Sequence, residues 1–162
     1  MSAYVPADLR RRVRDHFASC CAYCRTAEGL TVAIFEFEHI VPRSAGGETV
    51  FENICFACPS CNRYKANRTV AVDPGTQDEV TLFHPHREEW SDHFAWSEDA
   101  TELTALTPTG RATIAALRMN RPQLSRSRGS SAPGVRVREG SHLRTPGRGE
   151  SEAGACRGSR RL

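Results

Sequence analysis

Apolar residues that recur every four positions predict a helix near the start of the chain, over residues 6–19. Leu9, Val13 and Phe17 fall on one face of this helix, and a cluster of arginines occupies most of the other positions. The apolar face is expected to pack on the core. The arginine cluster fits a solvated surface, with contact to phosphate groups as the alternative.

The next part of the chain alternates between strand-like and turn-like segments. Residues 31–37 are rich in β-branched and aromatic side chains and predict a strand. The run Ser-Ala-Gly-Gly at residues 44–47 predicts a turn, and an extended piece is expected near residues 49–51. Pro59 is typical of the first turn of a helix, which is expected to end near Arg68.

The pattern is simpler in the following segment. Residues 80–83 predict another strand, and residues 88–96 predict a short helical or irregular stretch. Thr107 followed by Pro108 is typical of a helix N-terminus. The helix that begins there carries apolar residues at Ile114, Leu117 and Met119.

The chain changes character near residue 125. Residues 125–162 are dominated by Arg, Gly, Ser and Pro, and such a segment buries too little apolar surface to offset the entropy lost on ordering. Residues 1–124 are therefore expected to form one domain, and residues 125–162 a disordered tail. The tail is either a solvated extension or a basic arm that adds salt-sensitive affinity for polyanions.

The formal net charge of +3 for the 162 residues is unevenly distributed. Residues 1–124 hold 13 basic and 16 acidic residues, which gives a net charge of −3. Residues 125–162 hold 9 basic and 3 acidic residues, which gives a net charge of +6. The overall charge is therefore only weak support for a nucleic-acid partner.

The chain contains no run of about 18 apolar residues, and its first residues lack the apolar stretch of a signal peptide. We therefore expect a cytoplasmic protein that has no membrane partner. In a reducing compartment, paired cysteines among the seven in the chain are expected to be metal ligands rather than disulfides.

Two Cys-x-x-Cys pairs, Cys21 with Cys24 and Cys58 with Cys61, predict a Cys₄ zinc site. Four protein ligands leave no open position for water, so the Zn²⁺ is expected to be structural and to join the first helix to the later one. A redox pair and buried free cysteines are the alternatives. Cys55 with Cys58 would also be a Cys-x-x-Cys pair, but Cys55 lies in an apolar run and is expected in the core.

The segment between these pairs carries a set of residues with a specific order and spacing. They are Glu38-His39-Ile40-Val41-Pro42-Arg43-Ser44, Gly46-Gly47, Glu52-Asn53-Ile54 and Cys58-x-x-Cys61-Asn62-x-x-Lys65. From residue 21 to residue 65, the chain resembles the HNH family of metal-dependent endonucleases, in the subgroup whose motif is nested between two Cys-x-x-Cys pairs.

The resemblance implies an α+β fold with a small ββα-metal core, also called a His-Me finger, and flanking helices. It implies that His39 is the general base, that Glu38 and Asn62 hold a divalent cation, and that Asn53 holds the segment bearing the histidine in place. Oxygen ligands of this kind suit Mg²⁺ or Mn²⁺. A neutral imidazole with a pKa of about 6.5 suits proton transfer near neutral pH.

Two features of the motif set conditions for the structure. Glu38 and His39 are neighbours on an expected strand, where successive side chains point to opposite faces, so the strand must bend or end there. Many family members have Asp in place of Glu38, and the last motif position is Asn62 rather than a second histidine. Direct metal ligation by Glu38 is therefore less firmly implied than the role of His39.

Three basic residues lie close to the motif and are candidates for contact with DNA phosphates: Arg43, Arg63 and Lys65. Arg63 and Lys65 lie on the helix that carries Asn62. The alternative for each is an exposed cation on the protein surface.

The sequence thus predicts an enzyme that hydrolyses DNA phosphodiester bonds with a divalent cation and leaves a 5′-phosphate and a 3′-hydroxyl, as the resemblance implies. The alternatives are a non-catalytic zinc-knuckle module that binds nucleic acid and a structural zinc fold for protein contact. The presence of all four motif residues favours the enzyme. A monomer that nicks, a homodimer that cuts both strands and a protein partner that supplies specificity stay open.

Overall fold

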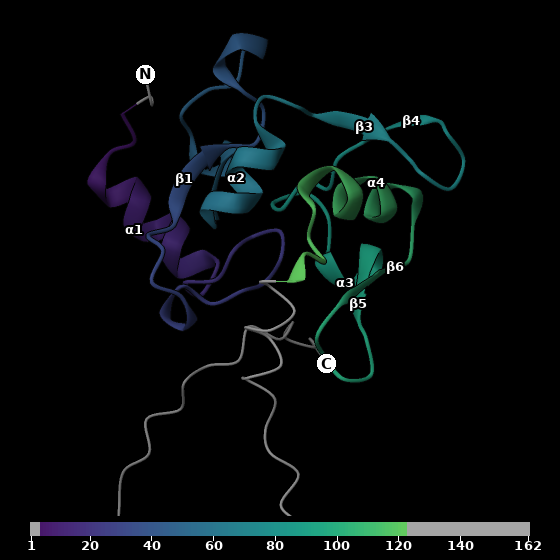
Figure 1. The fold of residues 1–162 in the computed structure, drawn as a ribbon. Coiled ribbons are helices and arrows are strands. Elements are labelled where there is room, and N and C mark those ends of the chain that lie inside the picture. The colour runs from purple at the N-terminus through teal and green to yellow at the C-terminus, as the bar shows by residue number, and fades with distance from the viewer. Residues whose placement is uncertain (1–3, 123–162) are drawn as a thin grey trace, which may run out of the picture.

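A computed structural model describes residues 4–122 as an α+β fold of short helices and two-stranded sheets (Figure 1). The first helix, α1, covers Ala7–His16 and buries Leu9 and Val13 as predicted. It ends before Ser19 because Ala18 and Ser19 have positive φ angles of 49° and 56°, which an α-helix does not accommodate. The predicted tail lies outside the described residues.

The site is built on a hairpin and the helix that follows it. Strands β1 (Glu36–His39) and β2 (Ile54–Ala57) pair antiparallel, and α2 (Pro59–Lys65) comes directly after them. Figure 1 shows α1 on one side of this hairpin and α2 on the other. The ββα order confirms the predicted core.

The predicted strand at residues 31–37 is wrong over most of its length. Glu28–Leu30 form a 3₁₀ turn, and β1 begins only at Glu36. Val32 and Ile34 are exposed, with relative accessibilities of 107% and 83%. β-Branched residues favour a strand only where a partner strand is in register, and β2 pairs with Glu36–His39 instead.

Two further boundaries differ from the prediction. The extended piece expected near residues 49–51 is followed by a 3₁₀ turn at Phe51–Asn53, and the strand itself starts at Ile54. Helix α2 ends at Lys65 rather than near Arg68, because Ala66 has a φ angle of 51°. It begins at Pro59 as predicted, and Cys58 is its N-cap residue.

The remainder of the described chain consists of two small hairpins and two helices. Thr107 caps α4 as predicted, and its hydroxyl accepts a hydrogen bond from the Gly110 amide. The strands at Val70–Val72 and Leu103–Ala105 were not predicted, and Phe94–Trp96, expected in a short helical or irregular stretch, form a strand. The elements are β3 (Val70–Val72) paired with β4 (Glu79–Thr81), α3 (Trp90–His93), β5 (Phe94–Trp96) paired with β6 (Leu103–Ala105), and α4 (Pro108–Leu117).

The core joins both parts of the described chain. Helix α4 packs against α2, β3, β4 and β6 (Figure 1). The indole of Trp90 donates a hydrogen bond of 2.8 Å to the carbonyl oxygen of Tyr23, which lies between two of the paired cysteines. Large side chains in the core include Val13, Tyr23, Ile54, Phe56, Phe83, Phe94, Leu117 and Met119. No helix within residues 4–122 is long and apolar enough to cross a membrane.

An ion pair between the buried carboxylate of Asp73 and the partly exposed Arg111 fastens the β3–β4 hairpin to α4. Both carboxylate oxygens of Asp73 accept hydrogen bonds from the Arg111 guanidinium, at 2.8 and 2.7 Å. Asp73 also accepts bonds from the Gly75 amide and the Thr76 hydroxyl, and its side chain is not exposed. The hydrogen bonds from Arg111 hold the pKa of Asp73 well below its usual value of 3.8.

The Asp73→Ala variant should have a lower Tm than the wild type at pH 7, because the carboxylate that binds Arg111 is lost. A depressed pKa stabilises the fold above pH 3.8, and this contribution disappears as the pH falls. The difference in Tm should therefore shrink in acid, as measured by thermal melts followed by circular dichroism. Asp78→Ala, which changes an exposed residue of the same hairpin, is the control. Equal Tm values for Asp73→Ala and wild type at pH 7 would show that the pair does not stabilise the fold.

Candidate functional site

Four buried cysteines form the predicted cluster. The sulfur atoms of Cys21, Cys24, Cys58 and Cys61 all lie within 4.8 Å of one another. The first pair lies in the turn after α1, and the second pair lies at the start of α2. Within residues 4–122, this is the one group of three or more His, Cys, Asp or Glu side chains that could hold a metal ion together.

The spacing of the cluster fits a tetrahedral ion. Four thiolates bound at about 2.3 Å stand about 3.8 Å apart. The observed distance between the sulfur atoms of Cys24 and Cys58 is 3.9 Å. The Cys61 amide donates to the Cys58 sulfur at 3.4 Å, so the helix N-terminus itself orients one ligand.

Cys55 is not part of this cluster. It is buried on β2, and its sulfur lies 3.7 Å from the Tyr23 hydroxyl. Burial raises the pKa of the Cys55 thiol to about 12, which keeps it protonated. Its place in the core is the one predicted from the apolar run around it.

His39 is the last residue of β1, where the regular strand ends. Its Nε2 lies 2.9 Å from the Thr49 hydroxyl, in the loop that leads to β2. Its Nδ1 has no hydrogen-bond partner among the residues described. Burial, together with the charges of Arg43 and Lys65, lowers the pKa of His39 below 6.5, so the imidazole is neutral near pH 7.

Asn53 cross-links the loop that connects the two strands. Its Oδ1 accepts a hydrogen bond of 2.8 Å from the Val41 amide, and its Nδ2 donates to the carbonyl oxygens of Val41 and Glu48. The side chain is buried, so these bonds replace the water that it loses. The loop segment that follows His39 is thereby held against the start of β2.

Gly46 and Gly47 in the loop are each required for a different structural reason. Gly46 has a φ angle of +84°, which favours glycine, and ends the 3₁₀ turn Arg43–Ala45 within the predicted turn. At Gly47, a Cβ atom would lie 1.8 Å from the carbonyl oxygen of Val41 and 2.8 Å from Asn53 Nδ2. Only glycine fits there while Asn53 keeps its bonds.

Glu38 is held by a buried lysine. The Lys65 ammonium donates to Glu38 Oε1 at 2.9 Å and to the carbonyl oxygen of His39 at 3.1 Å. The Lys65 side chain is 2% exposed and that of Glu38 is 12% exposed. Burial raises the pKa of Glu38 above 4.5, although the Lys65 charge opposes this shift.

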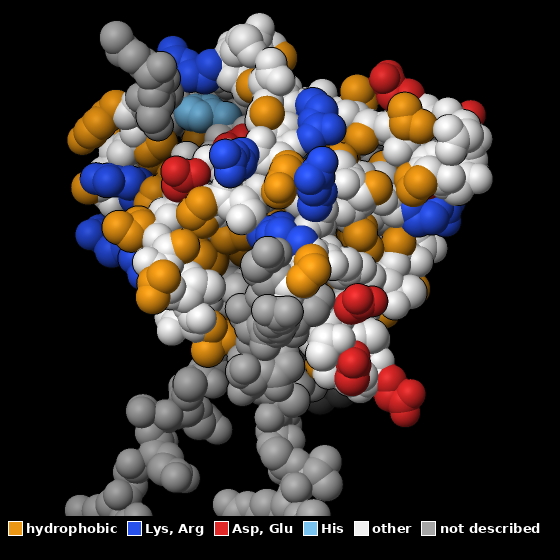
Figure 2. Space-filling view, in the orientation of Figure 1, with side chains coloured by type: hydrophobic (Ala, Val, Ile, Leu, Met, Phe, Trp, Pro, Cys, Tyr) orange, Lys and Arg blue, Asp and Glu red, His pale blue; other side chains and the backbone are white. Residues whose placement is uncertain are grey.

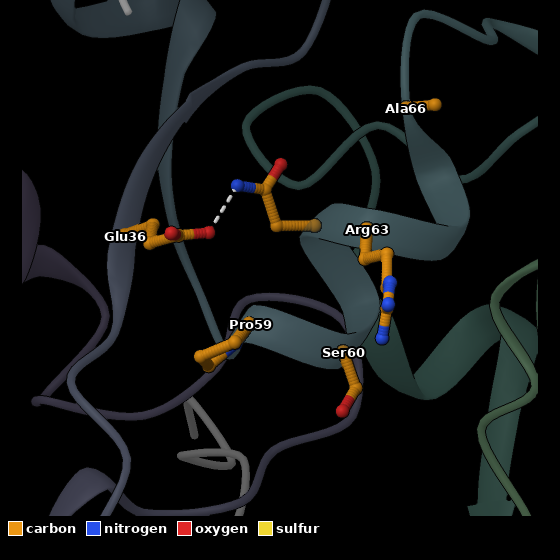
Figure 3. Close-up of a pocket in the computed structure, with 6 residues that line it drawn as sticks. Glu36, Pro59, Ser60, Arg63 and Ala66 are labelled. Carbon is orange, nitrogen blue, oxygen red and sulfur yellow. Dashed lines mark hydrogen bonds between the residues drawn. The ribbon is translucent and has the colours of Figure 1, made fainter.

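Asn62 faces the same side of β1 but contacts a different carboxylate. Its Nδ2 donates to Glu36, the bond marked in Figure 3, rather than to Glu38. Glu36 and Glu38 are two residues apart on β1 and therefore share a face. This face is turned toward α2. An open hollow of about 550 Å³ lies here, lined by Glu36, Pro59, Ser60, Asn62, Arg63 and Ala66.

The three predicted phosphate contacts fall into two kinds. Arg43 and Arg63 are exposed, and Arg63 lies at the edge of the hollow (Figure 3). Lys65 is buried, and its ammonium is turned toward Glu38 and His39, so it reaches no phosphate while it keeps these bonds. Its burial therefore contradicts the prediction that Lys65 contacts DNA phosphates, and also the alternative of an exposed surface cation.

Sequence reasoning missed two partners of the predicted site. Glu36 binds Asn62, and Thr49 binds His39. The alternation of carboxylates in Glu-Phe-Glu-His is a signal for Glu36, because it places Glu36 and Glu38 on one face. Thr49 has no such signal, since its place depends on how the loop folds back.

The comparisons with known proteins agree with this geometry. Residues 21–68 match a protein-family model described as HNH endonuclease. The matched segment contains β1, β2, α2 and all four clustered cysteines, a combination consistent with the subgroup in which two cysteine pairs flank the motif. No curated protein and no solved structure matches the chain.

The Gly47→Ala variant should be less stable by about 1–3 kcal/mol or more, because the new methyl group overlaps the Val41 carbonyl and forces the loop to move. Urea denaturation measures this difference. Gly29→Ala is the matched control, since nothing lies within 4 Å of a Cβ atom there. Equal stability of the two variants would contradict the tight approach at Gly47.

Proposed function

We propose that the chain is a metal-dependent endonuclease that hydrolyses DNA phosphodiester bonds, because residues 21–68 match the HNH endonuclease family model. The proposal depends most on one observation within this domain. A neutral imidazole, that of His39, stands at the strand end with Nδ1 unoccupied by any described residue, on a loop braced by Asn53.

The Cys₄ cluster is proposed to hold a structural Zn²⁺. Its donors are four sulfur atoms, which are the ligands that zinc prefers in closed structural sites. Four protein ligands leave no position for water or substrate. The cysteines would therefore join the turn after α1 to the N-terminus of α2 and orient the residues that α2 carries.

His39 is proposed as the general base that takes a proton from the attacking water. In the proposed tautomer, Nε2–H donates to the Thr49 hydroxyl, which fixes the ring and leaves Nδ1 unprotonated and available to receive the proton. The lowered pKa of His39 keeps the ring neutral at neutral pH, so that one of its nitrogens can accept a proton. Asn53 supports the reaction by holding the adjacent loop, without contact with the reacting atoms.

Glu38 and Asn62 are proposed to hold a divalent cation, Mg²⁺ or Mn²⁺. Carboxylate and amide oxygens suit these hard ions, and two protein ligands leave room for water and phosphate. When bound, such an ion supplies charge stabilisation at the phosphoryl group and the leaving oxygen. The Lys65 ammonium orients the Glu38 carboxylate. Glu36 orients the Asn62 side chain by accepting a hydrogen bond from the NH₂ group of Asn62.

DNA is the proposed partner, and the exposed Arg43 and Arg63 are proposed to contact its phosphates.

One observation favours the alternative of a non-catalytic module that binds nucleic acid. The Glu38 carboxylate already has a cation partner in Lys65, and a carboxylate that is fully used in this way does not need a metal ion. Cleavage assays distinguish the two functions.

The zinc assignment predicts different results for two neighbouring cysteines. Cys58→Ser should lose its bound zinc and unfold at a lower temperature, because the cluster closes only with four thiolates. Cys55→Ala should keep about one zinc per chain, since Cys55 lies outside the cluster. Metal analysis by inductively coupled plasma mass spectrometry and thermal melts measure both effects. A folded Cys58→Ser protein with unchanged Tm and no metal would reject the structural site.

The catalytic assignment predicts that His39→Ala lowers the rate of plasmid cleavage with Mg²⁺ or Mn²⁺ by about 10²–10⁴-fold, because the proton acceptor is lost. Thr49→Val should lower the rate less, since it removes only the orienting hydroxyl. Tm and DNA affinity should stay near wild type in both variants. Undiminished cleavage by His39→Ala would end the general-base assignment, and binding without any cleavage by the wild type would favour the non-catalytic module.

A further inference from the structure

The segment after α4 brings arginines from outside the HNH domain onto α2. The Arg118 guanidinium lies over the Tyr64 ring, with its carbon 4.9 Å from the ring centroid, and that of Arg121 lies 6.0 Å away. Tyr64 is half-buried and lies on α2 between Arg63 and Lys65. A guanidinium at this distance from an aromatic face is attracted to it and restricted in its motion.

The packing of α2 against α4 keeps this contact in place. Arg68 donates to the carbonyl oxygens of Tyr64 and Ala116, and thus bridges the ends of the two helices. The Arg121 guanidinium also reaches within 3.9 Å of the Cys58 sulfur. The position of Arg118 over α2 is therefore set by the fold and not by a flexible loop.

The charges of Arg118 and Arg63 are not neutralised by nearby carboxylates. Both side chains are exposed, and neither takes part in an ion pair among residues 4–122, whereas Arg14 and Arg111 do. Figure 2 shows Lys and Arg side chains gathered over α2 and between α2 and α4 on this face. A stacked guanidinium and an exposed one, neither with a carboxylate partner in the described part of the chain, point to an anionic ligand.

This basic surface continues from the candidate active site. Arg63 lines the hollow together with Glu36 and Asn62. The next residue on α2 is Tyr64, and the Arg118 guanidinium lies over its ring. A DNA strand with one phosphate at the hollow would therefore pass the Arg118–Tyr64 stack if it continued along α2. A stacked guanidinium keeps its edge N–H groups free for phosphate oxygens.

We propose that Arg63 and Arg118, the latter stacked on Tyr64, form a surface that binds the phosphate backbone of DNA beside the cleavage site. This inference rests on the proposed function, because it takes DNA as the ligand. It adds that the region after residue 68 takes part in substrate binding. Arg118 is then a binding residue that the HNH domain does not contain.

The test measures DNA binding in the His39→Ala background, so that cleavage does not interfere. Fluorescence anisotropy with a short labelled DNA duplex gives Kd over a range of salt concentrations, without added divalent cation. Arg118→Gln and Tyr64→Leu should each weaken binding roughly threefold or more, and Arg118→Gln should reduce the salt slope by about 1. Arg118→Lys should bind better than Arg118→Gln but worse than the parent, since it keeps the charge without the planar stack.

Arg10→Gln is the matched control. It removes the same charge from an exposed arginine on α1, far along the chain from this surface. Thermal melts identify any variant that weakens binding by unfolding, and the Arg118 variants carry the test if Tyr64→Leu does not fold. Equal binding by Arg118→Gln and the parent would overturn the proposal. So would an equal loss in Arg10→Gln, which would indicate an effect of net charge alone.

The outcomes separate this proposal from the proposed function. If no DNA binds to the parent protein, both are wrong. If DNA binds and the Arg118 variants behave like the parent, only the binding surface is wrong. If the Arg118 variants weaken binding but wild-type protein does not cleave with Mg²⁺ or Mn²⁺, the surface stands and the catalytic assignment falls.

Discussion

The convergence of four cysteines is the constraint on which the rest of the site depends. Two of them lie in the turn after α1 and two at the N-terminus of α2, so their approach fixes how α2 crosses β1. Because Asn62 and Lys65 are carried by α2, the cluster also sets which carboxylate each of them meets. Trp90 bonds to the Tyr23 carbonyl within the first cysteine turn and ties the later hairpins to the same point.

The sequence was informative where spacing alone determines geometry. The cysteine pairs, the proline at the start of α2, the capped start of α4 and the ββα order were predicted and are present. Strand positions were harder to predict, because the apolar run around Val32 looks like a strand but has no partner in register. Register is decided by contacts between distant segments, which composition does not contain.

The site was predictable in its residue types and less so in its contacts. Asn53 could be expected to brace the loop, but the approach at Gly47 that makes room for it depends on the folded backbone. Lys65 looks like a surface cation in the sequence, because it lies two residues after Arg63 on the same helix. It is buried because the face of α2 toward β1 includes it, and one helical turn separates it from Cys61.

The buried pair of Glu38 and Lys65 limits how this centre can change. Replacing one partner alone leaves an unbalanced charge in a poorly solvated place, and such a charge is strongly destabilising. A substitution at position 38 that removes the carboxylate would therefore have to be accompanied by one at position 65. The two positions are expected to vary together in related chains and to be redesigned as one unit.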